Sequence, residues 1–350
     1  MAQTFIDLFA GAGGLSWGLQ QSGMQCLLAS DHWGDAVKTY RHNMPDHPVI
    51  EADIRNISVA QLKRAIPQSP DWIVGGPPCQ GYSTVGKRDR TDPRNVLFLE
   101  FRRIVKGLRP AGFVIENVLG LKDMSFEQEV ADSFRELGYR VNFMVLTAAE
   151  HGVPQLRRRV VFVGHRSKGM FQGPAATHNA ETFISVDDAI GDLPQLGPGE
   201  STERYSGPPS SIFQKEMRGS EDTIQGHLVS KHPAHLVKAI SYIPDGGNRT
   251  AIPAKYQPKA GFHNSYSRLA SWLPAVAITQ NLGKPSGTRC IHPFQNRGLT
   301  TREGARLQSF PDCFHFLGGV VSQRQQVGNA VPPKLAESLG HALQDPYRWF

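Results

Sequence analysis

Cysteine is scarce in this chain. The 350 residues include four cysteines, Cys26, Cys79, Cys290 and Cys313, which are widely separated. No two of them have the spacing of a metal site, and together they cannot form the dense disulfide framework of a small secreted protein. We therefore expect a protein of the reducing cytoplasm, with no bound metal.

Long apolar runs are also lacking. No stretch reaches the roughly 20 apolar residues of a membrane helix, and the opening residues MAQTFIDLFAGAGGL lack the pattern of a secretory signal. Charged residues make up 20% of the chain, and the net charge is +7. We expect a cytoplasmic protein whose basic excess fits a polyanionic partner and, equally, an ordinary basic enzyme.

The first half of the chain alternates short apolar runs with amphipathic stretches, which is typical of β-α units around a mainly parallel sheet. The predicted strands are Thr4–Phe9, Gln25–Ser30, Val49–Glu51, Trp72–Gly75, Gly112–Glu116, Arg140–Thr147 and Arg159–Gly164. The predicted helices are Leu15–Ser22, Asp35–Asn43, Val59–Ala65, Val96–Gly107 and Phe126–Leu137. The expected fold is α/β, with helices on both faces of the sheet.

The composition changes after about Arg166, where clusters such as GDLPQLGPGE replace the regular pattern. This change predicts a second, smaller, loop-rich domain. Helical pattern returns at Thr301–Gln308 and, after a Pro332-Pro333 start signal, at Lys334–Leu343. We expect domains at 1–165 and 166–320, followed by a C-terminal segment at 321–350.

A glycine-rich turn, FIDLFAGAGG, joins the first strand to the first helix. Taken alone, it fits a dinucleotide site, a methyl-donor site or a tight turn equally well. Asp31 ends the second strand, where it could bind ribose hydroxyls, and Asp53 follows the third, near an adenine amino group. The alternative for both carboxylates is helix N-capping.

The segment DWIVGGPPCQGYS runs from an apolar strand through two prolines to Cys79. Carboxyl ends of parallel strands bind ligands in open α/β sheets, and the prolines stiffen the approach. An isolated cysteine is usually a small buried apolar residue, but this setting favours a nucleophile. The segment GFVIENV is another apolar strand, and parallel strands would bring Glu116 at its end to the edge that carries Cys79. Without such a partner, a glutamate at a strand end is more often solvated than catalytic.

Three arginines follow in QLRRR, Gln155–Arg159. This stretch introduces a predicted strand, and alternation places Arg157 and Arg159 on one face and Arg158 on the other. Two guanidinium groups could then hold a phosphate or a pyrimidine carbonyl. The alternative is a charged strand entrance without function.

Together these motifs resemble those of the DNA (cytosine-5) methyltransferase family, and they occur here in the family's order. The similar segments are DLFAGAGG, PPCQ, ENV, QLRRR, RGLTTREGARLQSFPD (Arg297–Asp312) and QVGNAVPP (Gln326–Pro333). The resemblance implies a Rossmann-like class I methyltransferase sheet, a smaller β-containing target-recognition domain, and a last segment that returns to the catalytic domain.

The resemblance also implies a mechanism without a metal. Cys79 would add to carbon 6 of a flipped-out cytosine, which activates carbon 5 for the methyl group of S-adenosylmethionine. Glu116 would bind the ring nitrogen and exocyclic amine, Arg159 would contact the carbonyl, and Arg157 would help hold the catalytic loop. Proton loss and elimination of Cys79 would give 5-methylcytosine and S-adenosylhomocysteine.

The cofactor contacts implied by the family are spread over both halves of the chain. They are Phe9, Ala10, Gly11, Gly13, Gly14, Asp31, His32, Asp53, Ile54, Pro77, Leu97, Asn329 and Val331. Two positions depart from the common pattern: Asp31 replaces a frequent glutamate, and His32 replaces a large apolar or aromatic side chain. An imidazole can still stack on adenine, so the departures bear on affinity.

The expected partner is double-stranded DNA, with a short sequence specified within residues 166–295 by segments such as KHPAHLVK and PDGGNRT. The resemblance further suggests a monomeric, nucleoid-associated enzyme of bacterial or phage type. It would be either a solitary methylase or part of a restriction-modification system, in which a cognate endonuclease would form no stable complex with it. The alternatives are an RNA methyltransferase, a non-catalytic relative and an unrelated dinucleotide oxidoreductase. The intact nucleophile and cofactor motifs disfavour the second.

Overall fold

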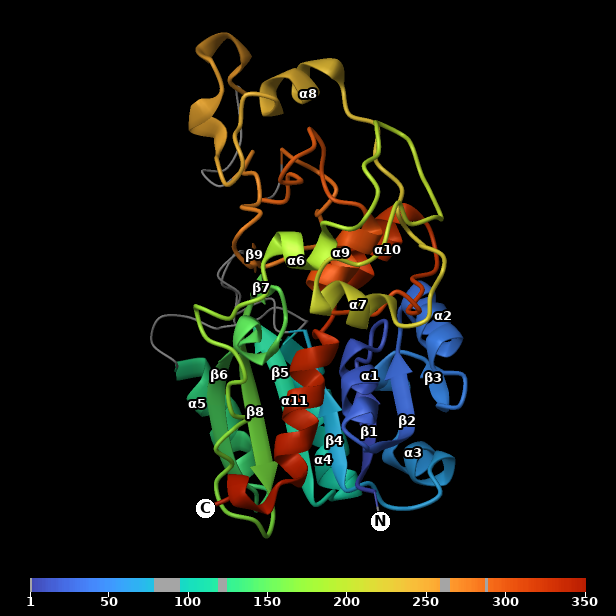
Figure 1. Ribbon diagram of the computed structural model, residues 1–350. Coiled ribbons are helices and arrows are strands. Elements are labelled where there is room, and N and C mark those ends of the chain that lie inside the picture. Colours follow the sequence, from blue (N-terminus) through green and yellow to red (C-terminus); the bar gives the residue numbers. More distant parts are fainter. Residues whose placement is uncertain (1, 79–94, 119–124, 259–264, 287–288) are drawn as a thin grey trace. The chain divides into compact units, whose positions relative to one another are not determined.

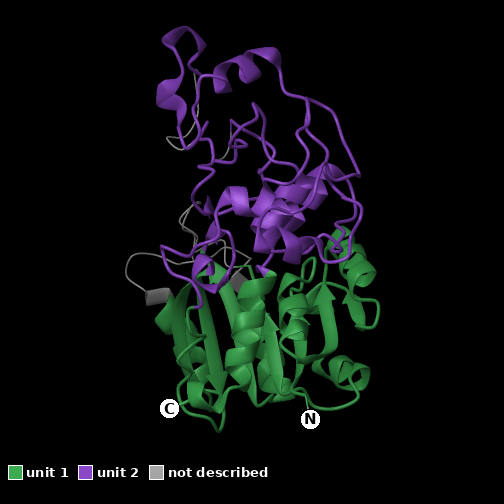
Figure 2. Cartoon of the chain, in the orientation of Figure 1, with its two compact units in different colours: residues 1–147, 158–176, 333–350 green, residues 148–157, 177–332 purple. Residues whose placement is uncertain are grey.

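The computed structural model describes residues 2–78, 95–118, 125–258, 265–286 and 289–350. The chain divides into two compact units, which Figure 2 colours separately. The first unit comprises Met1–Thr147, Arg158–Ala176 and Pro333–Phe350, and the second comprises Ala148–Arg157 and Thr177–Pro332. Each unit is therefore assembled from segments that are distant in the sequence.

A seven-stranded sheet forms the centre of the first unit (Figure 1). Its strands are β1 (Thr4–Leu8), β2 (Gln25–Asp31), β3 (Val49–Glu51), β4 (Trp72–Gly75), β5 (Gly112–Val118), β6 (Arg140–Thr147) and β8 (Arg158–His165). Their spatial order is β3-β2-β1-β4-β5-β8-β6. All seven strands were predicted, and their observed bounds differ from the predicted ones by at most two residues at either end.

The order of the strands reverses between β1 and β4. From β1 the chain builds outward through β2 to β3, and it then returns to place β4 and β5 on the other side of β1. These five strands are mutually parallel, so their carboxyl ends share one edge. Open α/β sheets bind ligands at such a reversal point. β8 runs antiparallel to β5, which brings the beginning of β8 to this edge.

Helices cover both faces of the sheet, as predicted. They are α1 (Gly14–Gln21), α2 (Gly34–Asn43), α3 (Val59–Ala65), α4 (Asn95–Leu108), α5 (Ser125–Arg135) and α11 (Pro333–Gln344), with the 3-10 turn η1 (Ile54–Asn56). α1 and α11 lie in front of the sheet in Figure 1, and α4 lies behind it. Buried side chains of α3, α4 and α5 pack with those of β1, β4 and β5 in one apolar cluster.

The compact units do not follow the boundaries expected from composition. Residues 166–176 belong to the first unit, because the chain after β8 pairs with the C-terminal residues: Met170 N–H donates to the carbonyl of Phe350, and Phe171 contacts Trp349. Residues 148–157 and 321–332 belong to the second unit. The part of the C-terminal segment that lies in the first unit is Pro333–Phe350.

The second unit is built from short elements and loops. Its strands β7 (Gln155–Leu156) and β9 (Ala275–Val276) pair with each other. Its helices are α6 (Val186–Ile190), α7 (Ile212–Arg218), α8 (Ala234–Ile240), α9 (Thr301–Leu307) and α10 (Val320–Asn329), with 3-10 turns η4 (Arg249–Ala251) and η5 (Ala254–Tyr256). No described helix of the chain is long and apolar enough to span a membrane.

Small residues allow α1 and α11 to approach each other closely. A Cβ atom on Gly18 of α1 would lie 2.2 Å from the Pro333 carbonyl oxygen and 2.5 Å from the Cβ of Ala336. A Cβ on Gly340 of α11 would lie 2.2 Å from the Ser22 Oγ. The returning segment is therefore held against α1 by backbone contact that leaves no room for a methyl group.

We predict that Gly18→Ala lowers the melting temperature of the full chain, although alanine is the better helix former by about 1 kcal/mol. The added methyl group overpacks the α1–α11 contact, which typically costs about 1–3 kcal/mol. Thermal denaturation measures the difference. Gln20→Ala, at an exposed position of the same helix, is the control and should change stability by about 0.5 kcal/mol or less. A Gly18→Ala variant as stable as this control would contradict the packing argument.

Candidate active site

The turn after β1 adopts a conformation that favours glycine. Phe9, Gly11 and Gly13 have φ angles of 62°, 55° and 99°. A Cβ on Gly13 would lie 2.2 Å from the Met44 side chain, whereas a Cβ on Gly11 would meet nothing within 4 Å. The non-glycine Phe9 in this region marks local strain of the kind found at functional sites. The turn is therefore tightly packed at Gly13 and open at Gly11.

Asp31 holds this turn from the end of β2. Its Oδ2 accepts a hydrogen bond from Gly11 N–H at 2.8 Å, and its Oδ1 accepts one from Trp33 N–H at 2.9 Å. Helix α2 has Trp33 as its N-cap, without a side-chain capping bond, so Asp31 is not a conventional helix cap. The adjacent His32 side chain is 73% exposed, with Nδ1 3.5 Å from Asp31 Oδ1.

Asp53 is engaged differently, and here the capping alternative is observed. Its side chain caps η1 by accepting from Arg55 N–H at 2.9 Å. Arg55 Nε also donates to both carboxylate oxygens at 3.0 Å. These bonds from Arg55 lower the pKa of Asp53 to about 2. A contact between Asp53 and adenine stays a prediction, and Arg55 would share the carboxylate.

The backbone that leads to Cys79 is fixed by β5. Asn117 Nδ2 donates to the Pro77 carbonyl at 2.9 Å, and Asn117 is buried. A Cβ on Gly76 would lie 3.5 Å from Glu116 Oε2, so the end of β4 runs beside this carboxylate. Cys79 itself lies outside the described residues. Gly76 and Pro77 therefore lie beside the end of β5 that carries Glu116 and Asn117.

Glu116 forms an ion pair with Arg159. Arg159 Nε lies 3.0 Å from Glu116 Oε1, and the two side chains are 14% and 12% exposed. This contact lacks hydrogen-bond geometry, and the buried Oε1 has no hydrogen-bond partner among the described residues. Arg159 opposes Val118 in the β5–β8 register, on the face that carries Glu116, because side chains two residues apart share a face. The carboxylate therefore keeps acceptor capacity for a ligand.

The arginine motif is not one continuous strand, so the alternation argument does not extend to Arg157, and a shared face for Arg157 and Arg159 stays a prediction. Arg157 lies between β7 and β8 and belongs to the second unit, whereas Arg158 and Arg159 begin β8 in the first. Arg157 is buried and donates to the carbonyls of Ile278 at 3.0 Å and Gly328 at 3.2 Å. Its guanidinium supports the backbone beside α10. A role toward the catalytic loop stays a prediction, because that loop lies outside the described residues.

The other predicted cofactor residues have diverse positions. Ala10 and Gly14 flank the glycine turn, Ile54 is buried in η1, and Leu97 of α4 packs against the apolar cluster. In the second unit, Asn329 ends α10 and accepts from Gln280 Nε2 at 2.7 Å, and Val331 is half-buried. That these residues contact a cofactor stays a prediction. Among the described residues, no three His, Cys, Asp or Glu side chains gather as metal ligands would.

Comparison with known proteins accounts for this arrangement. Residues 3–345 match the model of the C-5 cytosine-specific DNA methylase family. The chain belongs to this family. It is 40% identical to the type II methyltransferase M1.HphI of Haemophilus parahaemolyticus, over 98% of this chain and 87% of that protein. It is 37% identical to M.DdeI of Desulfomicrobium norvegicum, over 97% and 88% of the two chains.

The fold agrees with this assignment. A prophage-encoded protein of E. coli, solved as a candidate DNA modification methyltransferase, superimposes with a TM-score of 0.80 at 23% identity and covers 98% of this chain and 99% of its own. The Rossmann-like methyltransferase sheet is therefore confirmed. The protein is a DNA (cytosine-5) methyltransferase, and its reaction is methyl transfer to carbon 5 of cytosine in DNA.

The sequence interpretation missed two supporting residues that lie inside recognised motifs. Asp7, within DLFAGAGG, accepts from Ser16 Oγ at 2.6 Å and so links β1 to α1 on either side of the glycine turn. Burial raises the pKa of Asp7 to about 7. Asn117, within ENV, holds the Pro77 carbonyl. The sequence signal that could have identified both residues was their position inside these two motifs.

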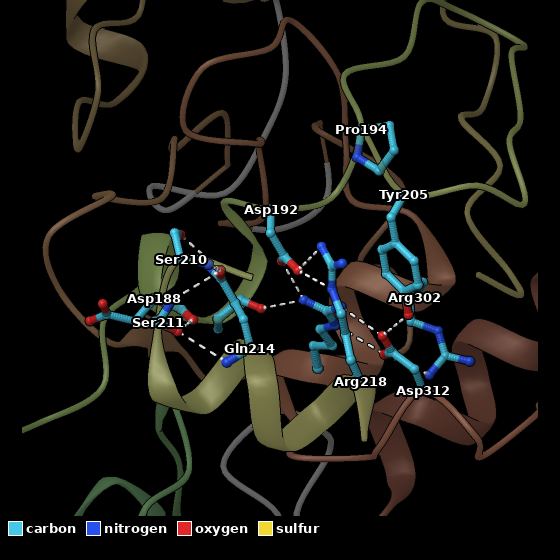
Figure 3. A network of polar contacts seen from close by, with 12 residues as sticks. Asp188, Asp192, Pro194, Tyr205, Ser210, Ser211, Gln214, Arg218, Arg302 and Asp312 are labelled. Carbon is cyan, nitrogen blue, oxygen red and sulfur yellow. Dashed lines mark hydrogen bonds and ion pairs between the residues drawn. The ribbon is translucent and has the colours of Figure 1, made fainter. Parts of the chain in front are cut away.

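The motif RGLTTREGARLQSFPD organises the second unit of the methyltransferase. Arg306 is fully buried, and its guanidinium pairs with Asp312 at 2.6 Å and with Asp192 at 2.5 Å. Figure 3 shows the surrounding contacts, in which Arg218 pairs with Asp192 and Tyr205 donates to Asp312. Burial alone would lower the pKa of Arg306, but the two carboxylates outweigh it and raise the pKa. The charge is thus fully compensated inside the unit.

We predict that Arg306→Met destabilises the methyltransferase by about 3–5 kcal/mol, because it leaves two buried carboxylates without their shared cation. The melting temperature of the full chain measures the loss. Arg204→Met makes the same exchange at an exposed position of the same unit and should have little effect. Equal melting temperatures for the two variants would refute the structural role of the pair.

Proposed function

We propose that this methyltransferase transfers a methyl group from S-adenosylmethionine to a cytosine within a short double-stranded DNA sequence, by covalent addition of Cys79 to a flipped-out base. The observation that carries the proposal is the environment of Glu116. Its buried Oε1 has no hydrogen-bond partner among the described residues, Arg159 lies 3.0 Å from it, and the backbone toward Cys79 passes beside it. The exocyclic amine of cytosine offers a donor to this oxygen, and the ring nitrogen can share a proton with the carboxyl group.

The turn between β1 and α1 fits an adenosine-containing methyl donor. It lies at the reversal point of the sheet, it leaves space at Gly11, and Asp31 is fixed beside it. Each Asp31 oxygen accepts one backbone N–H and retains a lone pair for a ribose hydroxyl. The exposed ring of His32 could cover an adenine. When bound, S-adenosylmethionine would supply an electrophilic methyl group on its sulfonium.

The residues of the chain would supply the activation of cytosine. Carbon 5 is a poor nucleophile until Cys79 thiolate adds to carbon 6 and converts the ring to an enamine. Glu116 would hydrogen-bond the ring nitrogen and the amine, and Arg159 would contact the carbonyl, so that charge developing on the ring is offset. Loss of the carbon 5 proton then expels Cys79 and restores the aromatic ring.

A cytosine stacked in a duplex cannot reach such groups, so the base must flip out. We assign target recognition to the second unit, because the first carries the sheet and the glycine turn. The relatives named above are type II methyltransferases. We therefore propose that the enzyme is the modification partner of a restriction endonuclease, that it acts as a monomer, and that the two enzymes form no stable complex.

We predict that expression in a bacterium without cytosine methylation produces one short methylated sequence throughout the genome. Bisulfite sequencing measures it, with Cys79→Ala expressed to the same level as the matched control. The variant should methylate nothing while it still binds S-adenosylmethionine in a calorimetric titration. Methylation by Cys79→Ala would overturn the covalent mechanism. If the soluble wild-type enzyme methylated RNA instead of DNA, the proposed substrate would be wrong.

We predict that Glu116→Gln slows methyl transfer by about 10²-fold or more, because an amide cannot supply the proton at the ring nitrogen that offsets the negative charge developing on the ring. Single-turnover transfer of labelled methyl groups to duplex DNA measures the rate. Glu136→Gln changes an exposed carboxylate of the same unit and should retain the wild-type rate. A Glu116→Gln enzyme with that rate would remove Glu116 from the mechanism.

A further inference from the structure

Basic residues are concentrated in one stretch of the second unit. Residues 223–302 contain ten lysines and arginines and a single acidic residue, Asp245, which gives a net charge of +9. The whole chain has a net charge of +7, so the other 270 residues together carry −2. The formal positive charge of this protein is therefore concentrated in 80 residues.

Some of these cations are structural. Arg268 is buried and donates to the carbonyls of Ile240 at 3.0 Å and Ile243 at 2.8 Å, so it fixes the end of α8. Arg297 pairs with Glu303, and Arg302 with Asp312. Both arginines are buried. These three guanidinium groups are used inside the unit and cannot meet DNA.

The single acidic residue of the stretch is also used internally. Asp245 Oδ1 accepts from Ser271 N–H at 2.9 Å, and its Oδ2 accepts from Ser271 Oγ at 2.5 Å. The carboxylate thereby joins the loop after α8 to the loop before β9. It is not paired with any of the exposed lysines among the described residues.

Two exposed lysines are held by a stacked pair of tyrosines. The rings of Tyr242 and Tyr256 are 5.5 Å apart and inclined by 22°. Lys238 Nζ lies 5.0 Å from the centre of the Tyr242 ring, and Lys255 Nζ lies 4.8 Å from that of Tyr256. In Figure 1, α8 (gold) carries Lys238, and the following orange segment includes η5 with Lys255.

An apolar cluster supports the tyrosine pair. Tyr256 packs against a small apolar cluster that includes Ile240, Ile243 and Ile252. A lysine over a ring face gains about 0.5–1 kcal/mol at an exposed site and loses part of its freedom. Among the described residues, neither ammonium group forms an ion pair. Two positive charges are therefore presented to solvent in positions fixed before any partner arrives.

We propose that Lys238 and Lys255, positioned by the Tyr242–Tyr256 stack, bind phosphates of the DNA backbone and supply sequence-independent affinity. The inference rests on the proposed double-stranded DNA substrate. An ammonium group is a point charge suited to phosphate, whereas reading a base edge favours a planar, bidentate group. These lysines thus hold the duplex while other side chains select the sequence.

The test is the salt dependence of binding, measured by fluorescence anisotropy of a labelled DNA duplex over a series of KCl concentrations. Each phosphate contact contributes about 0.9 to the slope of log affinity against log salt. We expect Lys238→Gln/Lys255→Gln to reduce the slope by about 2 and to weaken binding of unrelated duplexes equally. Lys238→Arg/Lys255→Arg keeps both charges and should keep the slope.

Lys63→Gln/Arg64→Gln is the matched control. It removes two exposed charges from the last turn of α3, which leads to the amino end of β4, away from the edge that carries the glycine turn. Its slope should equal that of the wild type. An unchanged slope in the Lys238/Lys255 variant, or tighter binding of duplex RNA than of duplex DNA, would overturn the inference. If the enzyme methylates DNA but the Lys238/Lys255 variant has the wild-type slope, only this inference is refuted. If the slope falls in that variant but the enzyme does not methylate DNA, only the proposed reaction is refuted.

Discussion

The site depends on one constraint, that parallel strands end at a common edge. β1, β2, β4 and β5 deliver the glycine turn, Asp31, the Pro77 backbone and Glu116 to that edge without any of these residues being close in sequence. Arg159 reaches the edge only because β8 runs in the opposite direction, so that its first residues lie where the parallel strands end. Reversal of this strand is what allows a guanidinium to meet the Glu116 carboxylate. Two loops at this edge are then each fixed by a hydrogen bond between a side chain and the backbone. Asp31 accepts from Gly11 N–H, and Asn117 donates to the Pro77 carbonyl.

The first unit was predictable because its elements are strongly patterned. Strands of this sheet occur in the sequence as short apolar runs, and all seven were found from such runs. The second unit was less predictable. Helix α10 has a glycine N-cap without a side-chain bond and a weak apolar pattern, so no signal distinguished it from a loop. Arg157 and Arg159 illustrate another limit of prediction from sequence. Side-chain alternation applies only within one strand, and β7 ends before Arg157 while β8 begins after it.

Asp31 and Asp53 show how far residue patterns can predict a site. Asp31 ends β2, Asp53 follows β3, and each precedes a helical turn, so the sequence permits the same two roles for both. In the structure, Asp53 caps η1 and binds Arg55, whereas Asp31 holds Gly11. The difference arises from neighbours: an arginine two residues away competes for Asp53, and the opposing turn of another strand reaches Asp31. The second kind of neighbour cannot be seen in a local sequence pattern.

The second unit separates the tasks of its cations by chemistry. Arg268, Arg297, Arg302 and Arg306 are buried, and each directs several donors to carbonyls or carboxylates that the fold supplies. A planar guanidinium with five donors suits such fixed partners, whereas a lysine would leave many of them unsatisfied. The lysines that the structure describes in this unit lie at the surface, together with arginines such as Arg204, and a strongly hydrated ammonium group there suits exchange of counterions with a phosphate backbone. The net charge counts buried and exposed cations equally. Which of these cations can contact a polyanion depends on burial, and burial is seen only in the structure.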